Sequence, residues 1–462
     1  MLTTILAGLF VLGVVIIVHE FGHFIVAKLS GVYVKVFAIG FGKKLARFRH
    51  GETVYAICAL PFGGYVKFAG ESELMDEPAP ELPAGEVRHP LDETPDAEIP
   101  RERFFTTQPR WIRALILLAG PFMNYLLAVV LFIGVYLVQG VNVVPTTRVG
   151  DVAADGPAAH AGIAPGDTIV TIDGAVVRDW YDVENLLVRE PDKRKVIVTR
   201  SEGRVRELNY QPDVEDGRVS LGMYAFASTR IGRVQKNKPA YKAGLEPGSV
   251  IEAINDTTVT TYGDLVRIIN ANADRPLYIR WSTDGLAHAD TIVPEPKQVL
   301  KPGSTSEFTT VGIIGIHPYS ERRREGLFAG IANGFHTANA MTGQIVQYLG
   351  MLLTGKMGVK TLGGPITITQ MAGDVANWGF DYLLGFLAFF NINLCVFNLI
   401  PLLPFDGGHL AILGIEGIMR RPVNRRLRDW LTQGGFVLII LLMAFVLVLD
   451  LSRCAGSTPG GF

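Results

Sequence analysis

Residues 2–29 read LTTILAGLFVLGVVIIVHEFGHFIVAKL, an apolar run that carries His19, Glu20 and His23 in its second half. A helix needs roughly 20 apolar residues to cross the hydrocarbon core of a membrane. Ionisable side chains inside such a span are costly, so they generally mark a functional site. The run lacks a basic leading region and a small-residue cleavage site, which predicts a retained membrane helix and not a signal peptide.

The two histidines lie four residues apart, so a helix places them on one face, one turn from each other. Both imidazoles can then bind one metal ion, and Glu20 can deprotonate a water bound to that ion. The H-E-x-x-H pattern is typical of zinc hydrolases. A buried structural pair of histidines is the alternative. A glutamate between them, with no basic partner nearby, disfavours it.

Composition indicates a membrane protein with substantial soluble parts. The chain has 462 residues, of which 48% are hydrophobic and 19% charged. A net charge of −1 gives no indication of nucleic-acid binding. The cysteines Cys58, Cys395 and Cys454 show neither metal-site nor disulfide spacing.

Four stretches, residues 4–28, 111–138, 381–403 and 434–451, are long and apolar enough to cross a membrane. A fifth, 327–354, is interrupted by glycines and polar residues, so we expect an amphipathic helix on the membrane or against the bundle. Basic residues gather between the first two spans and between the last two. The positive-inside rule makes both links cytoplasmic, with the termini and the middle region on the other side.

The first cytoplasmic segment has two parts. Residues 31–70 alternate in polarity around a turn at 61–64, which predicts a small β-sheet at the membrane surface. Residues 71–102 hold eleven acidic residues, two arginines and six prolines, which predicts a flexible linker. Binding of a partner by this acidic segment is the alternative.

The middle region contains a repeat. The pattern Pro-Ala-x-x-Ala-Gly-(Ile/Leu)-x-Pro-Gly-x-x-Ile occurs at residues 157–169 and 239–251, running from a short helix through a turn into a strand. It resembles bacterial PDZ domains, predicted at 141–222 and 223–300. Such domains bind an extended peptide or chain end beside an exposed strand. Whether either groove is occupied is left open.

Catalytic zinc sites hold three protein ligands and an open water position. The best third ligand is Asp406, within NLIPLLPFDGGH at residues 398–409. It follows the third span at the cytoplasmic end, and His19 and His23 lie on the order of 10 Å inside that boundary. A helix-capping role for Asp406 and a competing ligand role for His409 are the alternatives.

Taken together, H-E-F-G-H, the Asp-Gly-Gly motif at 406–408 and the tandem PDZ-like repeats resemble the site-2 protease family of intramembrane zinc metalloproteases. The likeness is greatest to the bacterial inner-membrane members that control the sigma-E stress response. It extends to the AGPFMN motif at 119–124 and to Gly-Gly-Pro-Ile at 363–366. It implies one Zn²⁺ per chain, held by His19, His23 and Asp406, with Glu20 as general base.

The resemblance also implies that the sheet near 52–68 receives an unwound substrate. The residues implied in substrate binding are Asn398, Gly63, Gly64 and Tyr65. Two departures from the family pattern stand out, because Pro404 comes one place late and Phe405 replaces a leucine. The spacing from Asn398 to Asp406 is kept, so the ligand assignment stands while the loop shape is open.

The expected function is cleavage of transmembrane segments of single-pass proteins. By resemblance, these are an anti-sigma factor already cut by another protease and remnant signal peptides, with the PDZ pair screening out bulky external domains. The expected location is the bacterial inner membrane, with PDZ domains and termini periplasmic and the site toward the cytoplasm. The lipid bilayer is an expected partner and nucleic acid is not. Zinc over another divalent ion is a family expectation.

Two other functions remain as alternatives. One is a membrane-anchored zincin with a soluble catalytic domain, which would need the motif on a polar-faced helix. The other is a PDZ scaffold or chaperone with a vestigial metal site, which an intact Glu20 disfavours.

The predicted fold class is a multi-pass α-helical membrane protein with four transmembrane helices, a membrane-associated β-sheet and two extracytoplasmic PDZ-like α/β domains. The predicted parts are a first span at 1–30, the sheet at 31–70, the linker at 71–102, a second span at 103–140, the repeats at 141–222 and 223–300, a helix and loop at 301–379, a third span at 380–410, and the basic link with the fourth span at 411–462.

Overall fold

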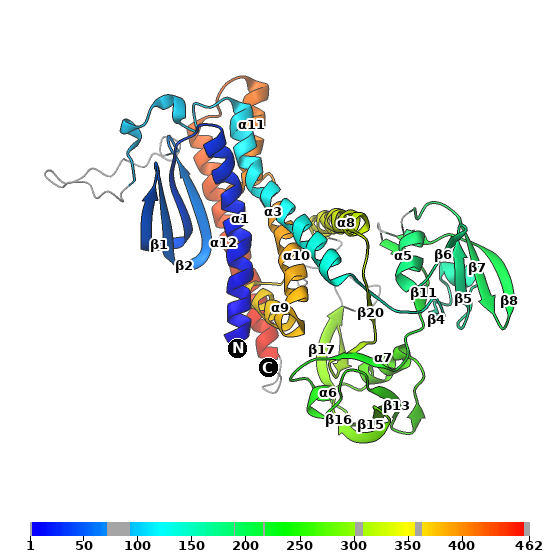
Figure 1. The fold of residues 1–462 in the computed structure, drawn as a ribbon. Coiled ribbons are helices and arrows are strands. Elements are labelled where there is room, and N and C mark those ends of the chain that lie inside the picture. Colours follow the sequence, from blue (N-terminus) through cyan, green and yellow to red (C-terminus); the bar gives the residue numbers. More distant parts are fainter. Residues whose placement is uncertain are drawn as a thin grey trace. The chain divides into compact units, whose positions relative to one another are not determined.

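The computed structural model describes residues 2–71, 93–188, 190–215, 218–300, 308–355 and 363–456 (Figure 1). The chain forms two compact units. We call Met1–Val138 with Gly326–Phe462 the membrane unit and Gln139–Glu325 the repeat unit. The repeat unit is therefore an insertion in the membrane unit, and each is described by itself.

Four helices of the described residues are long and apolar enough to cross a membrane, as expected. They are α1 (Leu2–Leu29), α3 (Arg110–Gln139), α10 (Phe380–Asn398) and α12 (Arg425–Gly456). The third ends at Asn398 and not at the expected residue 403. Pro401 and Pro404 follow, and proline cannot continue the backbone hydrogen bonds of a helix.

The predicted helix at 327–354 is present as α8 (Leu327–Leu353), which packs against α3. A Cβ at Gly334 would lie 2.4 Å from the Ile133 side chain, so the two helices touch there through a glycine. The position of α8 at the membrane surface remains a prediction.

Within the expected loop before the third span lies a further helix, α9 (Pro365–Trp378). The buried carboxylate of Asp450, on α12, accepts hydrogen bonds from the backbone N–H groups of Gly364, Ile366 and Thr367 at 3.1, 3.1 and 3.2 Å. A distant side chain thus satisfies the free N–H groups at the start of this helix. No local pattern indicates such a cap, which explains the wrong prediction of a loop.

The predicted sheet is formed by two long strands beside α1, β1 (Val34–His50) and β2 (Thr53–Phe68), which together we call the hairpin (Figure 1). Residues 44–50 of β1 pair with 53–58 of β2, and residues 34–39 of β1 pair both with 54–57 and with 64–68 of β2. Val34 and Phe68 pack with Ala27 of α1 in one buried cluster. The other end of the hairpin, toward His50, is exposed. Contact between the hairpin and a membrane surface remains a prediction.

The predicted flexible linker is wrong at its C-terminal end, and residues 72–92 of it lie outside the described residues. Residues 93–102 fold against the hairpin. Asp96 forms an ion pair with Lys35 at 3.0 Å, and Glu93 forms one with Lys44 at 3.0 Å. The acidic composition of this segment predicts disorder. It does not show that Lys35 and Lys44 of β1 form ion pairs with the segment.

The repeat unit contains two copies of one α/β arrangement. The first copy consists of β4 (Val149–Val152), α4 (Pro157–His160), β5 (Thr168–Ile172), β6 (Ala175–Val176), α5 (Trp180–Val188), β7 (Lys195–Ser201), β8 (Arg204–Tyr210) and β11 (Met223–Ala225). The second consists of β12 (Ile231–Val234), α6 (Pro239–Lys242), β13 (Val250–Ile254), β14 (Thr257–Thr258), α7 (Tyr262–Asn270), β15 (Leu277–Thr283), β16 (Leu286–Ile292) and β19 (Ile316–Pro318). Their four-stranded sheets have the matching orders β6-β5-β7-β8 and β14-β13-β15-β16.

The predicted ends of both repeats need correction. Each copy closes with a strand that returns to pair with its first strand, β11 with β4 and β19 with β12. The closing strands end at residues 225 and 318, beyond the predicted repeat ends at 222 and 300. The repeated motif does not mark these closing strands, because their partners lie far away in the sequence.

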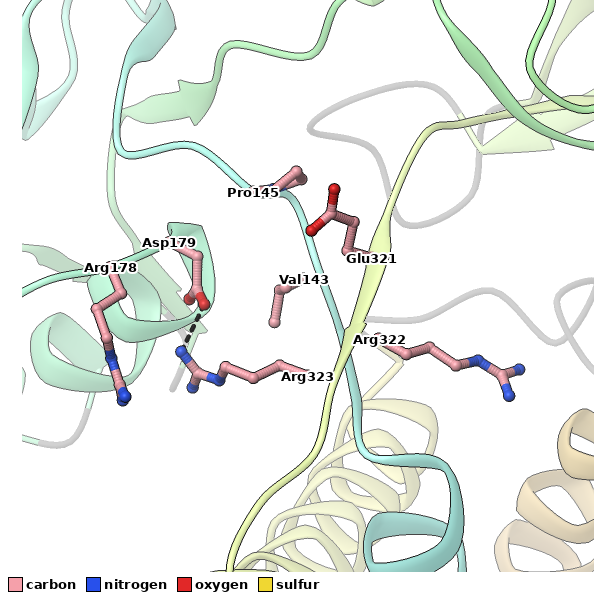
Figure 2. Close-up of a pocket in the computed structure, with 7 residues that line it drawn as sticks. All are labelled: Val143, Pro145, Arg178, Asp179, Glu321, Arg322 and Arg323. Atoms are coloured by element: carbon pink, nitrogen blue, oxygen red, sulfur yellow. Dashed lines mark hydrogen bonds and ion pairs between the residues drawn. The ribbon is translucent and has the colours of Figure 1, made fainter.

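The chain enters and leaves the repeat unit through one antiparallel ribbon, β3 (Val141–Val143) paired with β20 (Glu321–Arg323). Arg323 of this ribbon forms ion pairs with Asp179 and Asp182 of the first repeat. Figure 2 shows the pocket beside this contact, in which Arg323 points toward Asp179. The ribbon is thereby attached to the first repeat.

Candidate metal centre

Helix α1 is unbroken through its polar residues, so His19 and His23 lie one turn apart on the same face. Their rings are 4.8 Å apart between centroids, and their Nε2 atoms are 3.2 Å apart. Both side chains are buried, with exposed fractions of 8% and 7%. The two nitrogens therefore point to one place inside the membrane unit.

The third expected ligand reaches the same place from a distant part of the chain. Asp406 is the first residue of α11 (Asp406–Met419). Its Oδ2 lies 3.2 Å from Nε2 of His19 and 3.5 Å from Nε2 of His23. The described residues contain this one group of three metal-ligand side chains, and His409 is not part of it.

The geometry fits a bound cation. Although Asp406 Oδ2 is buried and close to both imidazoles, it has no hydrogen-bond partner among the described residues. Nδ1 of His23 lies 2.8 Å from the carbonyl oxygen of Ile116. Since a carbonyl only accepts, Nδ1 must carry the hydrogen, which leaves the Nε2 lone pair free for a metal. Two imidazole nitrogens and a carboxylate oxygen form a donor set that suits zinc.

The two glycines after Asp406 let this carboxylate reach the site. A Cβ at Gly407 would lie 2.4 Å from the carbonyl carbon and oxygen of Leu399, and one at Gly408 would lie 2.5 Å from the nitrogen of Leu403. The first turn of α11 therefore packs directly on the loop that follows α10. The shifted Pro404 does not prevent Asp406 from meeting the two histidines.

Helix α3 also contacts the site, although the residue pattern predicts no metal-site role for this helix. A Cβ at Gly120 would lie 2.3 Å from Nε2 of His23 and 2.8 Å from Cε1 of His19. Asn124, four residues later, is fully buried with Nδ2 3.3 Å from Nδ1 of His19. An asparagine one helical turn from a glycine, inside an apolar span, is the signal that could have indicated this contact.

Two expected substrate-binding residues, Asn398 and Gly64, lie beside His19 and Glu20. Nδ2 of Asn398 is 3.3 Å from Nε2 of His19. Glu20 accepts a hydrogen bond from the backbone N–H of Val66 in β2, and a Cβ at Gly64 would lie 3.1 Å from Cγ of Glu20. The hairpin therefore borders the glutamate.

The other two expected substrate-binding residues contact a different side chain. A Cβ at Gly63 would overlap the ring of Phe41, and Tyr65 stacks on that ring with centroids 6.3 Å apart. Their roles toward a substrate remain predictions.

Comparison with known proteins gives one family. The chain matches peptidase family M50 over residues 7–442. The regulator of sigma-E protease RseP of Escherichia coli K12 is 34% identical over 96% of this chain and 97% of its own. Protease RseP of Yersinia pestis is 32% identical over 98% and 99% of the two chains.

A relative from Vibrio cholerae, which carries the words zinc metalloprotease in its name, is 31% identical over 97% of this chain and 98% of its own. A solved PDZ domain of the SdrC-like protein of Listeria monocytogenes covers 21% of this chain and 90% of its own, at 17% identity and a TM-score of 0.16. The chain therefore belongs to peptidase family M50, the site-2 protease family that its motifs resemble, and is a zinc metalloprotease.

Proposed function

We propose that this protein is an intramembrane endopeptidase that cleaves the transmembrane segments of single-pass proteins. The observation that carries the proposal is the convergence of His19, His23 and Asp406, with Oδ2 of the aspartate lacking a hydrogen-bond partner among the described residues. The histidines lie in a helix apolar enough to span a membrane. A soluble zincin would not need to bury its metal ligands in such a helix.

The proposed roles use the side chains that meet at the metal centre. His19, His23 and Asp406 would hold one Zn²⁺, which when bound polarises the scissile carbonyl and acidifies a water molecule. Glu20, next to His19 in α1, would act as the general base that accepts a proton and as the acid that returns it to the leaving amine. The amide of Asn398, next to His19, donates a hydrogen bond to the substrate backbone.

A helical substrate hides its carbonyl groups in backbone hydrogen bonds, so it must unwind before it is cut. We assign this step to the hairpin of β1 and β2, with Gly63, Gly64 and Tyr65 beside the incoming strand. Pairing with a strand edge replaces the hydrogen bonds that the helix loses. Gly64 packs against Glu20, which would bring such a strand to the general base.

The biological setting is proposed from the relatives, of which the Escherichia coli protein is named for regulating sigma-E. The proposed substrates are an anti-sigma factor already cut by another protease and remnant signal peptides. The protein would lie in the bacterial inner membrane with the repeats and both termini periplasmic and the metal site toward the cytoplasm. The repeats would exclude substrates with bulky external domains.

The test uses Glu20→Gln in the full-length protein with a membrane reporter that carries one transmembrane segment. The variant should keep bound zinc by metal analysis but lose cleavage by at least about 100-fold, because it lacks the proton acceptor. Persistent cleavage would remove Glu20 from the mechanism. Unchanged stress signalling without cleavage would favour the scaffold alternative.

A further inference from the structure

The amide of Asn124 has an unexplained environment at the metal centre. The side chain is fully buried, and Nδ2 lies 3.3 Å from Nδ1 of His19. Its Oδ1 is also buried and has no hydrogen-bond partner among the described residues. A buried amide oxygen without a partner is unfavourable, so it calls for an explanation.

The tautomer of His19 supplies that explanation. Nε2 of His19 faces Oδ2 of Asp406 at 3.2 Å and Nε2 of His23 at 3.2 Å. To offer a lone pair to a cation, Nε2 must be free of hydrogen, so Nδ1 must carry it. An N–H at Nδ1 needs an acceptor, and the amide of Asn124 is the group at that position.

We propose that Asn124 is a positioning residue, whose Oδ1 accepts the Nδ1 hydrogen of His19 and so holds the ring in its metal-binding tautomer. A half-turn of the amide about its terminal bond exchanges Nδ2 and Oδ1 at nearly the same positions. This half-turn gives the oxygen a donor and removes the conflict between two N–H groups at Nδ1, while the amide N–H₂ takes the position that Oδ1 occupied. The carbonyl oxygen of Ile116 accepts the Nδ1 hydrogen of His23, as the amide oxygen of Asn124 would accept that of His19. Both acceptors belong to α3, which therefore orients both rings.

The packing of α3 explains how the amide reaches the ring. Gly120 leaves no room for a side chain against the imidazoles, so the helix backbone approaches them closely. Asn124 follows by four residues and therefore lies on the same face of α3. A shorter side chain at this position would leave Nδ1 of His19 without an acceptor.

The test measures metal affinity, and it rests on the proposed function because it requires the wild type to bind zinc. Zinc affinity of the full-length protein is determined by competition with a chelator for wild type, Asn124→Ala and Asn124→Asp. We expect Asn124→Ala to bind zinc about 10- to 100-fold more weakly, as is typical when a partner of a metal-bound histidine is removed. Asn124→Asp, which keeps an acceptor, should stay within a few-fold of wild type.

The matched control is Asn391→Ala. Asn391 is also fully buried in an apolar helix, with an unpartnered Oδ1 among the described residues, but its Nδ2 bonds to Leu387 of its own helix. This variant should bind zinc as wild type does. Visible spectra of the cobalt-substituted proteins should change for Asn124→Ala alone, because His19 would no longer be held in one orientation.

Three results would overturn the assignment. They are unchanged zinc affinity in Asn124→Ala, an equal loss in Asn124→Asp, and an equal loss in the Asn391 control. A wild-type protein that binds no zinc would instead contradict the proposed function, so the two failures are distinguishable.

Discussion

The two repeats share their core contacts but differ along one strand edge. In the first, the Arg148 guanidinium lies 4.8 Å from the ring centroid of Phe226, and in the second Arg230 lies 4.2 Å from that of Tyr319. The same pairs form backbone hydrogen bonds of 2.8 and 3.1 Å, in which the residue just after the closing strand donates to the residue just before the first strand. Duplication therefore preserved the way in which each copy closes.

The first difference is the residue that begins the long helix of each copy. In the first copy it is Trp180, which is 5% exposed and packs in the core with Met223. In the second it is Tyr262, whose hydroxyl donates a 2.9 Å hydrogen bond to the carbonyl oxygen of Ile316. The neighbouring carbonyl, of Gly315, accepts a 2.8 Å hydrogen bond from the backbone N–H of Gln235, the residue after β12. By strand alternation the carbonyl of Ile316 therefore faces away from β12.

The second difference lies two residues further along the same edge. Ala225 of the first copy corresponds to Pro318 of the second, and proline has no N–H to donate. The edge of β19 has thus lost one donor, and one of its acceptors is taken by Tyr262. The two copies therefore keep similar cores while this strand edge differs, and in the second copy the edge offers one donor and one free acceptor fewer.

The largest effect in this comparison is expected from Trp180→Ala. It removes a fully packed aromatic side chain and should destabilise the first repeat by about 3–5 kcal/mol. Hydrogen exchange of the full-length protein should accelerate in β7 and β8 and stay unchanged in β15 and β16. Equal acceleration in both copies would show that the repeats do not unfold separately.

Arg323→Ala tests the attachment of the ribbon to the first repeat. It leaves buried Asp179 without its ion-pair partner, which should cost about 2–5 kcal/mol and accelerate exchange in α5. Arg267→Ala is the matched control, because it breaks an exposed ion pair with Asp264 in the second copy. We expect Arg267→Ala to lower the stability of the second copy by less than about 1 kcal/mol. Similar losses in the two variants would contradict a special role of Arg323 in holding the ribbon on the first repeat.

Acid should loosen the same attachment. Burial alone would raise the pKa of Asp182, but hydrogen bonds from Arg323 and Arg178 hold it below its ordinary value. A lowered pKa stabilises the fold above the ordinary carboxyl pKa of about 4, and this contribution is lost as pH falls through the lowered value. Exchange in α5 should therefore rise below about pH 4, and Arg323→Ala should weaken this dependence. An unaltered dependence in the variant would exclude Arg323 as its source.

Tyr262→Phe should have the smallest effect. It removes one hydrogen bond and should lower the stability of the second repeat by about 0.5–1.5 kcal/mol. Amide hydrogen exchange near residues 316–319 should accelerate. Burial raises the pKa of Tyr262 to about 12, so the hydroxyl remains a donor at alkaline pH. Tyr278→Phe, at an exposed position of β15, should change nothing. Wild-type exchange in Tyr262→Phe would mean that the hydroxyl does not close this edge.

Much of the metal centre could be predicted from the sequence. His19 and His23 share a face because helical spacing is a local property, and Asp406 could be found because charge bias orders the spans. For the contacts of Gly120 and Asn124 the sequence offers only a weak signal, an asparagine one turn from a glycine in an apolar span. They depend on how closely α3 approaches α1, which hydrophobicity does not specify.

Sequence by itself determined the four apolar helices, the H-E-x-x-H pair and the duplicated middle region, because each of these follows from spacing between neighbouring residues. Only the tertiary structure decided where the closing strands of the repeats lie and that residues 93–102 pack against the hairpin. It also decided that the Asp450 carboxylate caps the first turn of α9. These features join groups far apart in the chain. These features are stabilised by ion pairs and hydrogen bonds between groups that are distant in the sequence. A local sequence pattern does not indicate which distant group will be the partner.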